Sequence, residues 1–211
     1  MNSLLQQCPT ILAINFVAQG MRGMGFKELA FRLLLQILVS VIIGLLAVPV
    51  LDRVDAVSLA IVGGHLFSFL ANGQFWVCCR YCALYRRSPD TLLAFTDRIA
   101  GKLQAKIWLR EALILGSLGD GRLAPGPRSD IDLRLVIPPG FDAWLKTNLL
   151  LLSLRIRAMI EGMPLDLYAY DSVDDLKRFR ADEAWLIIQD RDLALAARFP
   201  GRLMVHLERH R

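Results

Sequence analysis

The sequence predicts an α+β protein in which a two-helix transmembrane hairpin precedes a domain made of a mixed sheet and helices. Three observations lead to this fold class. Only seven Asp, Glu, Lys or Arg residues lie in positions 1–79, against thirty-eight in the remaining 132 positions. Two long uncharged segments lie within this N-terminal part. After them, segments that alternate apolar and polar residues, as strands do, are separated by segments with helical spacing.

The composition agrees with this division. The 211 residues are 55% hydrophobic, and the mean hydropathy is +0.41. These values exclude an intrinsically disordered chain, which is poor in apolar residues, and they argue against a purely soluble monomer. The net charge of +5 is modest and mostly due to Arg, so it gives no argument for nucleic acid as a partner.

The first 32 residues mix apolar and polar side chains and then become rich in glycine between Gln19 and Gly25. We expect a short amphipathic helix and a flexible joint here, and we assign this segment no function.

The hairpin is predicted from two uncharged runs. The first, from Leu33 to Leu51, has nineteen residues, and a helix of that length spans roughly 28 Å, close to the hydrocarbon core of a bilayer. The second, from Ala56 to Cys79, is less uniform, because Gly63-Gly64 and Asn72-Gly73-Gln74 interrupt it. Only four residues, 52–55, connect the runs, which favours a tight helical hairpin.

Cations outside the hairpin predict its orientation. Both ends carry them, and the loop between the helices holds one Arg and two Asp; the flanking residues are Arg22, Lys27, Arg32, Arg80, Arg86 and Arg87. The positive-inside rule places both ends in the cytoplasm. We therefore expect an integral membrane protein, with membrane lipid as a partner and the globular domain on the cytoplasmic face. The first run begins too late and is too long for a cleaved signal peptide.

Two alternatives to this hairpin stay open. It can be buried in a soluble core, or the segment around Gly63-Gly64-His65 can be re-entrant or interfacial, so that residues 56–79 do not fully span the bilayer. His65 is a candidate for a functional group inside the membrane, but a histidine beside two glycines is more typical of helix packing.

The four cysteines are Cys8, Cys78, Cys79 and Cys82. The Cys79-x-x-Cys82 pair has no second pair and no nearby histidine, whereas zinc sites of this class need four ligands. We interpret the cysteines as small buried hydrophobic residues at the membrane border.

The globular part begins at Ser88-Pro89, an N-cap followed by proline at the first helical position. We expect helices over 91–105, 141–161 and about 173–179, and strands over 112–115, 129–137, 164–170 and 184–189. The predicted organisation is an N-terminal segment over 1–32, the hairpin over 33–87, the α/β domain over 88–200 and a basic tail over 201–211.

Three carboxylates point to chemistry in this domain. Asp130 and Asp132, two residues apart on a strand, project from the same face. Carboxylates this close repel each other unless cations lie between them, which favours a divalent metal. Asp166 lies in a different predicted strand. If the two strands are neighbours, the three acids are enough to hold two magnesium ions for in-line phosphoryl transfer.

Gly116-Ser117 closes a strand and opens a loop upstream of these acids. Glycine lets backbone N–H groups approach a phosphate, and the serine hydroxyl adds a donor. A lone Asp-x-Asp or Gly-Ser is a weak signal. The ordered set of strand, Gly-Ser, loop, Ser129-Asp130-Ile131-Asp132-Leu133 and a later strand Asp is much more specific.

With these motifs, residues 90–195 resemble the nucleotidyltransferase superfamily typified by DNA polymerase beta, and are most similar to its small minimal nucleotidyltransferase domains. The resemblance implies that Asp130 and Asp132 bind two Mg²⁺ ions, that Asp166 is the third, catalytic carboxylate, which positions the attacking hydroxyl, and that Gly116 and Ser117 hold the triphosphate. Ser129 belongs to the same expected phosphate site. The implied reaction is attack of a hydroxyl on the α-phosphate of a nucleoside triphosphate, which releases pyrophosphate.

The sequence departs from this family after Gly-Ser, where Leu118 replaces the usual Arg or aromatic residue, and the loop that follows is long. Arg122 or Arg128 is the candidate for the missing phosphate contact. The hairpin is a further departure, and it suggests a lipid-linked or membrane-bound acceptor.

The functional hypothesis is a membrane-anchored, Mg²⁺-dependent nucleotidyltransferase. The alternatives are a non-catalytic module that senses nucleotides or binds a protein partner, as an antitoxin does, and a membrane scaffold with a vestigial domain. A protein partner or a homo-oligomer is compatible with all three.

Overall fold

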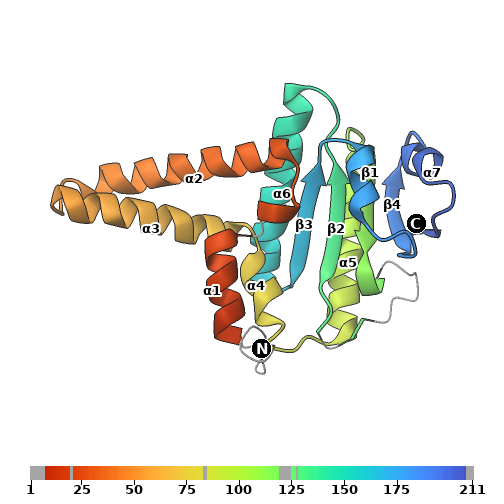
Figure 1. The fold of residues 1–211 in the computed structure, drawn as a ribbon, viewed down its shortest axis with the longest axis horizontal. Helices are drawn as coiled ribbons and strands as arrows, with labels where there is room; N and C mark the ends of the chain where they lie inside the picture. The colour runs from red at the N-terminus through yellow and green to blue at the C-terminus, as the bar shows by residue number, and fades with distance from the viewer. Residues whose placement is uncertain (1–7, 20, 83–84, 119–124, 127, 208–211) are drawn as a thin grey trace.

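The structure, a computed structural model, describes residues 8–19, 21–82, 85–118, 125–126 and 128–207. It is an α+β fold in which N-terminal helices precede a five-stranded mixed sheet with further helices. Figure 1 shows two long helices, α2 and α3, projecting side by side from the part of the molecule that holds the sheet.

The projecting hairpin consists of α2 (Phe26–Ala47) and α3 (Arg53–Ala71). Both helices are long and apolar enough to cross a membrane. They pack closely because small residues face each other: a Cβ on Gly64 would lie 1.9 Å from the Oγ of Ser40. At the turn between them, Asp52 caps α3 by accepting hydrogen bonds from the backbone N–H groups of Val54 and Asp55.

The second helix is shorter than the uncharged run that predicts it. The helix α3 ends at Ala71, and a separate short helix, α4 (Gln74–Cys79), follows. Gly73 lies between them with a φ of +73°, a left-handed conformation that glycine adopts without steric cost. Residues 56–79 are therefore not one continuous helix, and α4 belongs to the sheet-bearing part of the molecule.

The base of the hairpin is buried in the folded domain. Glu28 in α2 pairs with Arg32 one turn along at 2.5 Å and with Arg155 of α6 (Phe141–Glu161) at 2.6 Å. Its other carboxylate oxygen accepts a 2.6 Å hydrogen bond from the backbone N–H of Ala169. Arg32, a flanking cation in the sequence-based orientation, is thus inside the protein.

The helix α1 (Cys8–Ala18) packs beside α4 and the base of α3. His65 forms a 2.8 Å hydrogen bond with the carbonyl of Phe16 and contacts the side-chain nitrogen of Gln19 at 3.0 Å. The Oγ of Ser68 donates to Gln19 at 2.8 Å. These contacts confirm the helix-packing role predicted for His65.

A disulfide between Cys8 and Cys82 joins α1 to the turn after α4. Cys78 and Cys79 are free and buried. The interpretation of all four cysteines as buried hydrophobic residues was therefore wrong for Cys8 and Cys82, because the packing of α1 on α4 brings together residues 74 positions apart.

The sheet has the strand order β3-β2-β1-β4-β5. The central strand β1 runs antiparallel to both of its neighbours, while β2 is parallel to β3 and β4 is parallel to β5. The strands are β1 (Glu111–Leu115), β2 (Ile131–Val136), β3 (Leu165–Tyr170), β4 (Trp185–Asp190) and β5 (Met204–His206). The first four confirm the predicted strands, and β5 comes from the segment expected to be a basic tail.

Each face of the sheet has its own core. Helices α5 (Pro89–Gln104) and α6 cover one face, where their apolar side chains meet those of β1, β2 and β3. The short helices η3 (Val173–Arg178) and α7 (Ala194–Arg198) cover part of the other face. Within the described residues, two further turns of 3₁₀ helix are η1 (Met21–Gly23) and η2 (Gly116–Leu118).

Candidate active site

The predicted acidic residues lie together at the N-terminal ends of β2 and β3. The two strands are parallel, and their register places Asp132 directly opposite Asp166. Ile131, Leu133 and Leu135 belong to the core under α5 and α6. Because side chains alternate along a strand, Asp132 and Asp166 project from the opposite face, which η3 and α7 cover only in part.

Asp130 precedes β2 and lies beside this pair. The side chains of Asp130, Asp132 and Asp166 are 13%, 26% and 16% exposed, so each is half-buried and still reached by solvent. The strands that carry Asp132 and Asp166 are neighbours, as the predicted site requires.

Two arginines pair with the three carboxylates. The guanidinium of Arg134, two residues along β2, lies 2.8 Å from Asp166 and 3.4 Å from Asp132. Arg80, from the turn after α4, forms an ion pair with Asp130. Gln74, at the start of α4, donates to Asp166 at 3.4 Å and to the hydroxyl of Tyr168 at 3.2 Å.

Burial and mutual repulsion perturb these acids. Burial, together with the charge of Asp130, raises the pKa of Asp132 to about 8. Burial also raises the pKa of Asp130, although Arg80 opposes this effect. Burial acts to raise the pKa of Asp166 as well, but the guanidinium of Arg134 outweighs it, so that pKa lies below its usual range. The pKa values of Asp132 and Asp166 thus shift in opposite directions, and Arg134 lies closer to Asp166 than to Asp132.

Gly116 follows β1 and faces Asp132. Its φ is +71°, and a Cβ at this position would lie 2.8 Å from a carboxylate oxygen of Asp132. The backbone N–H of Gly116 donates a 3.0 Å hydrogen bond to the carboxylate of Glu183. This N–H therefore already binds an anionic oxygen, and Gly116 and Glu183 both line a cavity of about 290 Å³.

The loop after Gly116 is described in part. Ser117 donates to Ser129 through their hydroxyls at 2.9 Å, and Ser129 accepts from the backbone N–H of Gly126 at 2.8 Å. Ser117, Ser129 and Gly116 are thus together beside the acids. Arg128 is exposed. Arg122 lies outside the described residues.

Leu118, at the position where the family usually has Arg or an aromatic residue, is fully buried in the core between the sheet and α5 and α6. It does not contribute to the surface of the site.

Within the described residues, no group of three or more His, Cys, Asp or Glu side chains is placed so that it could hold a metal ion. Arg80 and Arg134 pair with the carboxylates instead. The acids are therefore adjacent, but they do not converge on one point as ligands.

Comparison of this chain with known protein families, with curated proteins and with solved structures finds no match.

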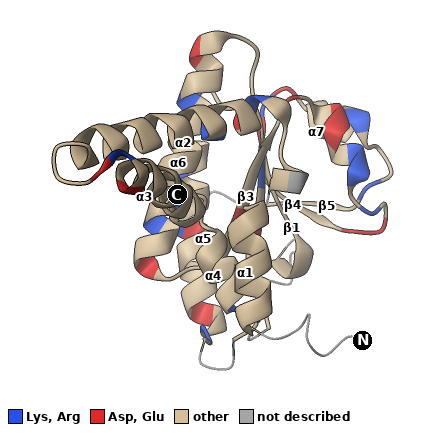
Figure 2. Cartoon of the chain, turned by 60° about the vertical axis from the view of Figure 1, so that its left-hand side comes forward, with Lys and Arg blue, Asp and Glu red and all other residues tan. Residues whose placement is uncertain are grey.

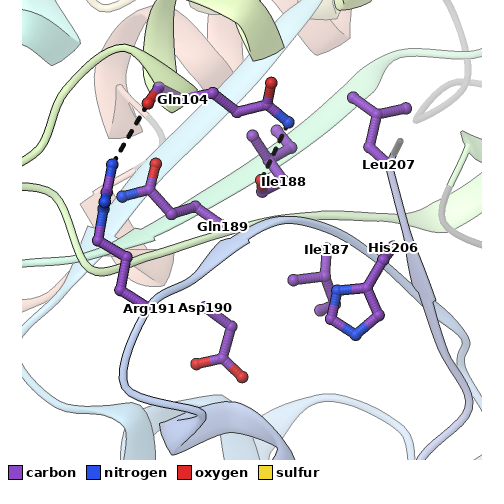
Figure 3. A pocket seen from close by; sticks show the side chains of 8 residues that line it. All are labelled: Gln104, Ile187, Ile188, Gln189, Asp190, Arg191, His206 and Leu207. Atoms are coloured by element: carbon purple, nitrogen blue, oxygen red, sulfur yellow. Dashed lines mark hydrogen bonds between the residues drawn. The ribbon is translucent and has the colours of Figure 1, made fainter. Parts of the chain in front are cut away.

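A second pocket, of about 250 Å³, lies apart from the acids, between the end of α5 and strands β4 and β5 (Figure 3). Its polar lining includes Gln104, which donates to the carbonyl of Ile188 at 3.3 Å, and Arg191, which donates to the carbonyl of Gln104 at 3.4 Å. The residues that the sequence predicts for the site do not line it.

Three residues of the site, Arg80, Gln74 and Glu183, were not predicted from the sequence. They come from α4 and from the segment before β4, and their proximity follows only from long-range packing. Arg134 was accessible from sequence, because alternation along β2 places it on the same face as Asp132.

Proposed function

We propose that this chain is a membrane-attached nucleotidyltransferase, which moves a nucleoside monophosphate from a nucleoside triphosphate to a hydroxyl acceptor. The observation that carries the proposal is the register of β2 and β3, which pairs Asp132 with Asp166 beside Gly116. The strand order agrees with it, since β1, β2 and β3 are adjacent and present the Gly-Ser turn and the three acids at one end of the sheet.

The donor set fits Mg²⁺ by its chemistry. Asp130, Asp132 and Asp166 offer only carboxylate oxygens, the ligands that this hard cation prefers. A nearby divalent cation also favours the ionised form of Asp132, whose pKa is raised in its absence. The three carboxylates do not converge in this structure, so binding by all three requires Arg80 to leave Asp130 and Arg134 to leave Asp132. When bound, Mg²⁺ neutralises phosphate charge and favours ionisation of the attacking hydroxyl.

The residues of the chain have distinct roles in this reaction. The N–H of Gly116 donates to a phosphate oxygen in place of Glu183, and the hydroxyls of Ser117 and Ser129 add further donors. Asp166 accepts a hydrogen bond from the acceptor hydroxyl and orients it, and Arg134 holds Asp166 in place. As the acceptor oxygen bonds to the α-phosphorus, its proton passes to the carboxylate of Asp166 and from there to solvent. The bond from that phosphorus to the bridging oxygen breaks, and pyrophosphate leaves.

The hairpin supports the membrane attachment. Figure 2 shows that charged residues lie at its base and at its tip, with none along the helices between. The exposed side chains between these points are almost all large and apolar, and in water such a surface is strongly unfavourable. We propose that the hairpin is inserted in the bilayer, with the site on the cytoplasmic side.

The test uses the full chain in detergent, α-labelled nucleoside triphosphates, Mg²⁺ and native membranes. Wild-type protein should transfer label to an acceptor, and the Asp130→Asn/Asp132→Asn double variant should not. Asp142→Asn, an exposed carboxylate at the start of α6, is the matched control and should transfer label normally. Metal binding by calorimetry gives a readout separate from turnover. Transfer that persists in the double variant would overturn the proposal.

A second candidate is a non-catalytic nucleotide-binding module. It is favoured by the arginines, because Arg80 and Arg134 already balance most of the charge of the three acids without a metal. Nucleotide binding that needs no Mg²⁺ and gives no transfer, and that survives the double acid-to-amide change, would identify this function instead.

A further inference from the structure

The helix α6 carries an apolar stripe that the fold does not bury. Leu149, Ile156 and Ile160 are 50%, 42% and 80% exposed. Leu145 and Leu152 are half-buried and continue the same line. Successive members of this set of five are four, three, four and four residues apart, so they form one stripe along the length of the helix.

This stripe borders the side of α6 that meets the hairpin. The indole N–H of Trp144 donates to the carbonyl of Lys27 in α2 at 2.8 Å, and Arg155 pairs with Glu28. Lower on the helix, Trp76 of α4 donates to the carbonyl of Met159 at 2.8 Å. At about 100° per residue, the stripe lies roughly a quarter-turn from these contacts, on the side away from the sheet.

The apolar surface of the hairpin therefore continues onto α6. The helix runs across the base of α2 and α3 in Figure 1. The next side of α6 is polar, and its residues are Asp142, Lys146, Ser153 and Arg157. In cross-section α6 thus has a core side, a hairpin side, an apolar stripe and a polar side, in that order.

We propose that α6 is an interfacial helix, which lies on the membrane surface at the base of the hairpin with Leu149, Ile156 and Ile160 among the lipid chains. This inference rests on the membrane attachment in the proposed function. Two features favour a bilayer as the occupant. The stripe lies beside the hairpin, and the adjoining side of α6 carries the cations Lys146 and Arg157, each paired with an acid one turn away. Mixed charges next to an apolar stripe are typical of a helix at the level of the lipid headgroups.

The test measures where single positions of α6 lie in the membrane. Leu149→Cys, Ile156→Cys and Ile160→Cys are each made in the full chain, with Asp97→Cys, at an exposed position of α5, as the control. The native free thiols are buried and the other two cysteines are paired, so a thiol-reactive nitroxide attaches to the introduced residue; labelled wild type measures the background. The protein is placed in vesicles of phosphatidylcholine and phosphatidylglycerol.

Collision with oxygen, which partitions into lipid, is compared with collision with a water-soluble nickel chelate. The ratio should be severalfold higher at 149, 156 and 160 than at 97. A uniform ratio that matches position 97 would overturn the inference. Spin–spin broadening between labelled copies would also overturn it, because a second copy of the chain would then cover the stripe.

A label at Val41→Cys on α2 separates this inference from the proposed function. A lipid-exposed label at 41 with water-exposed labels on α6 refutes the interfacial helix alone. A water-exposed label at 41 refutes the membrane attachment as well. Neither result depends on transfer activity.

Discussion

Gly116 occupies a position where a side chain has no room. Its φ of +71° is unfavourable for other residues, and a Cβ would press on the carboxylate of Asp132. We predict that Gly116→Ala lowers the free energy of unfolding by about 1–3 kcal/mol and weakens nucleotide binding. Denaturant unfolding in detergent and titration with a fluorescent nucleotide measure the two effects.

The matched control is Gly101→Ala in α5. Nothing lies within 4 Å of a Cβ at Gly101, and the residue is inside a helix, so alanine should raise stability by about 0.5–1 kcal/mol. Equal effects of the two substitutions would contradict the steric argument.

Glu111, at the opposite end of β1 from Gly116, makes the stability of the protein depend on pH. Burial raises its pKa to about 7 from a usual value of 4.5, and the charges of Asp190 and Asp192 add to the effect. Between these pH values the native protein binds more protons than the unfolded chain. The contribution of Glu111 to stability is therefore present in full below about pH 4.5 and is lost as the pH rises through about 7.

We predict that Glu111→Gln removes this loss. Wild-type protein should lose about 1–3 kcal/mol of stability across the window, and the variant should lose less. Unfolding by denaturant at a series of pH values measures both slopes. Asp192→Asn should give an intermediate slope, because it removes one of the repelling charges. A Glu111→Gln slope equal to that of wild type would show that another group causes the dependence.

At the scale of elements, Glu28 joins the hairpin to the sheet. It is fully buried, and it contacts Arg32 of its own helix, Arg155 of α6 and the backbone of β3. We predict that Glu28→Ala costs about 3–5 kcal/mol, because two buried guanidinium groups lose their partner. Thermal unfolding in detergent measures the change. Asp97→Ala, an exposed residue of α5, should change stability by less than about 0.5 kcal/mol.

The elements themselves were largely accessible from sequence because their signals are local. The helix α6 runs from Phe141 to Glu161 as the periodicity predicts, and its end at Gly162 follows from the left-handed conformation that glycine permits. The alternation over 129–137 likewise gives β2. By contrast, β5 has three residues and no alternation long enough to detect, and it forms only because β4 offers a free edge.

The site divides in the same way. The two-residue spacing of Asp130 and Asp132 on one strand is enough to predict that they lie close together. The proximity of Asp132 and Asp166 depends on which strands are neighbours, and the sequence does not determine that order. The sequence predicts that Arg80 flanks a transmembrane helix, because the residues before it are apolar. Its ion pair with Asp130 depends on the break at Gly73, which turns α4 toward the sheet.

For the whole molecule, two features give opposite expectations about the compartment. The cations Arg80, Arg86 and Arg87, and the nucleoside triphosphate that the proposed function requires, predict a cytoplasmic domain. The disulfide between Cys8 and Cys82 is a bond that persists in oxidising compartments and is rare in the cytosol. A cytoplasmic domain and this disulfide are compatible if Cys8 and Cys82 lie close together as thiols in the cell. Dioxygen would then oxidise them only after the cells are opened.

We predict that all four cysteines are thiols in the cell. Cells are quenched in acid, the protein is denatured, and a maleimide carrying polyethylene glycol is added, so that each thiol adds one mass step on a gel. Protein from cells should show four steps, and protein purified in air should show two, from Cys78 and Cys79. After air oxidation, Cys8→Ser should show three, because Cys82 then has no partner. Two steps from quenched cells would mean that the disulfide forms in vivo; the domain would then lie on the oxidising side, and the cytoplasmic orientation would be wrong.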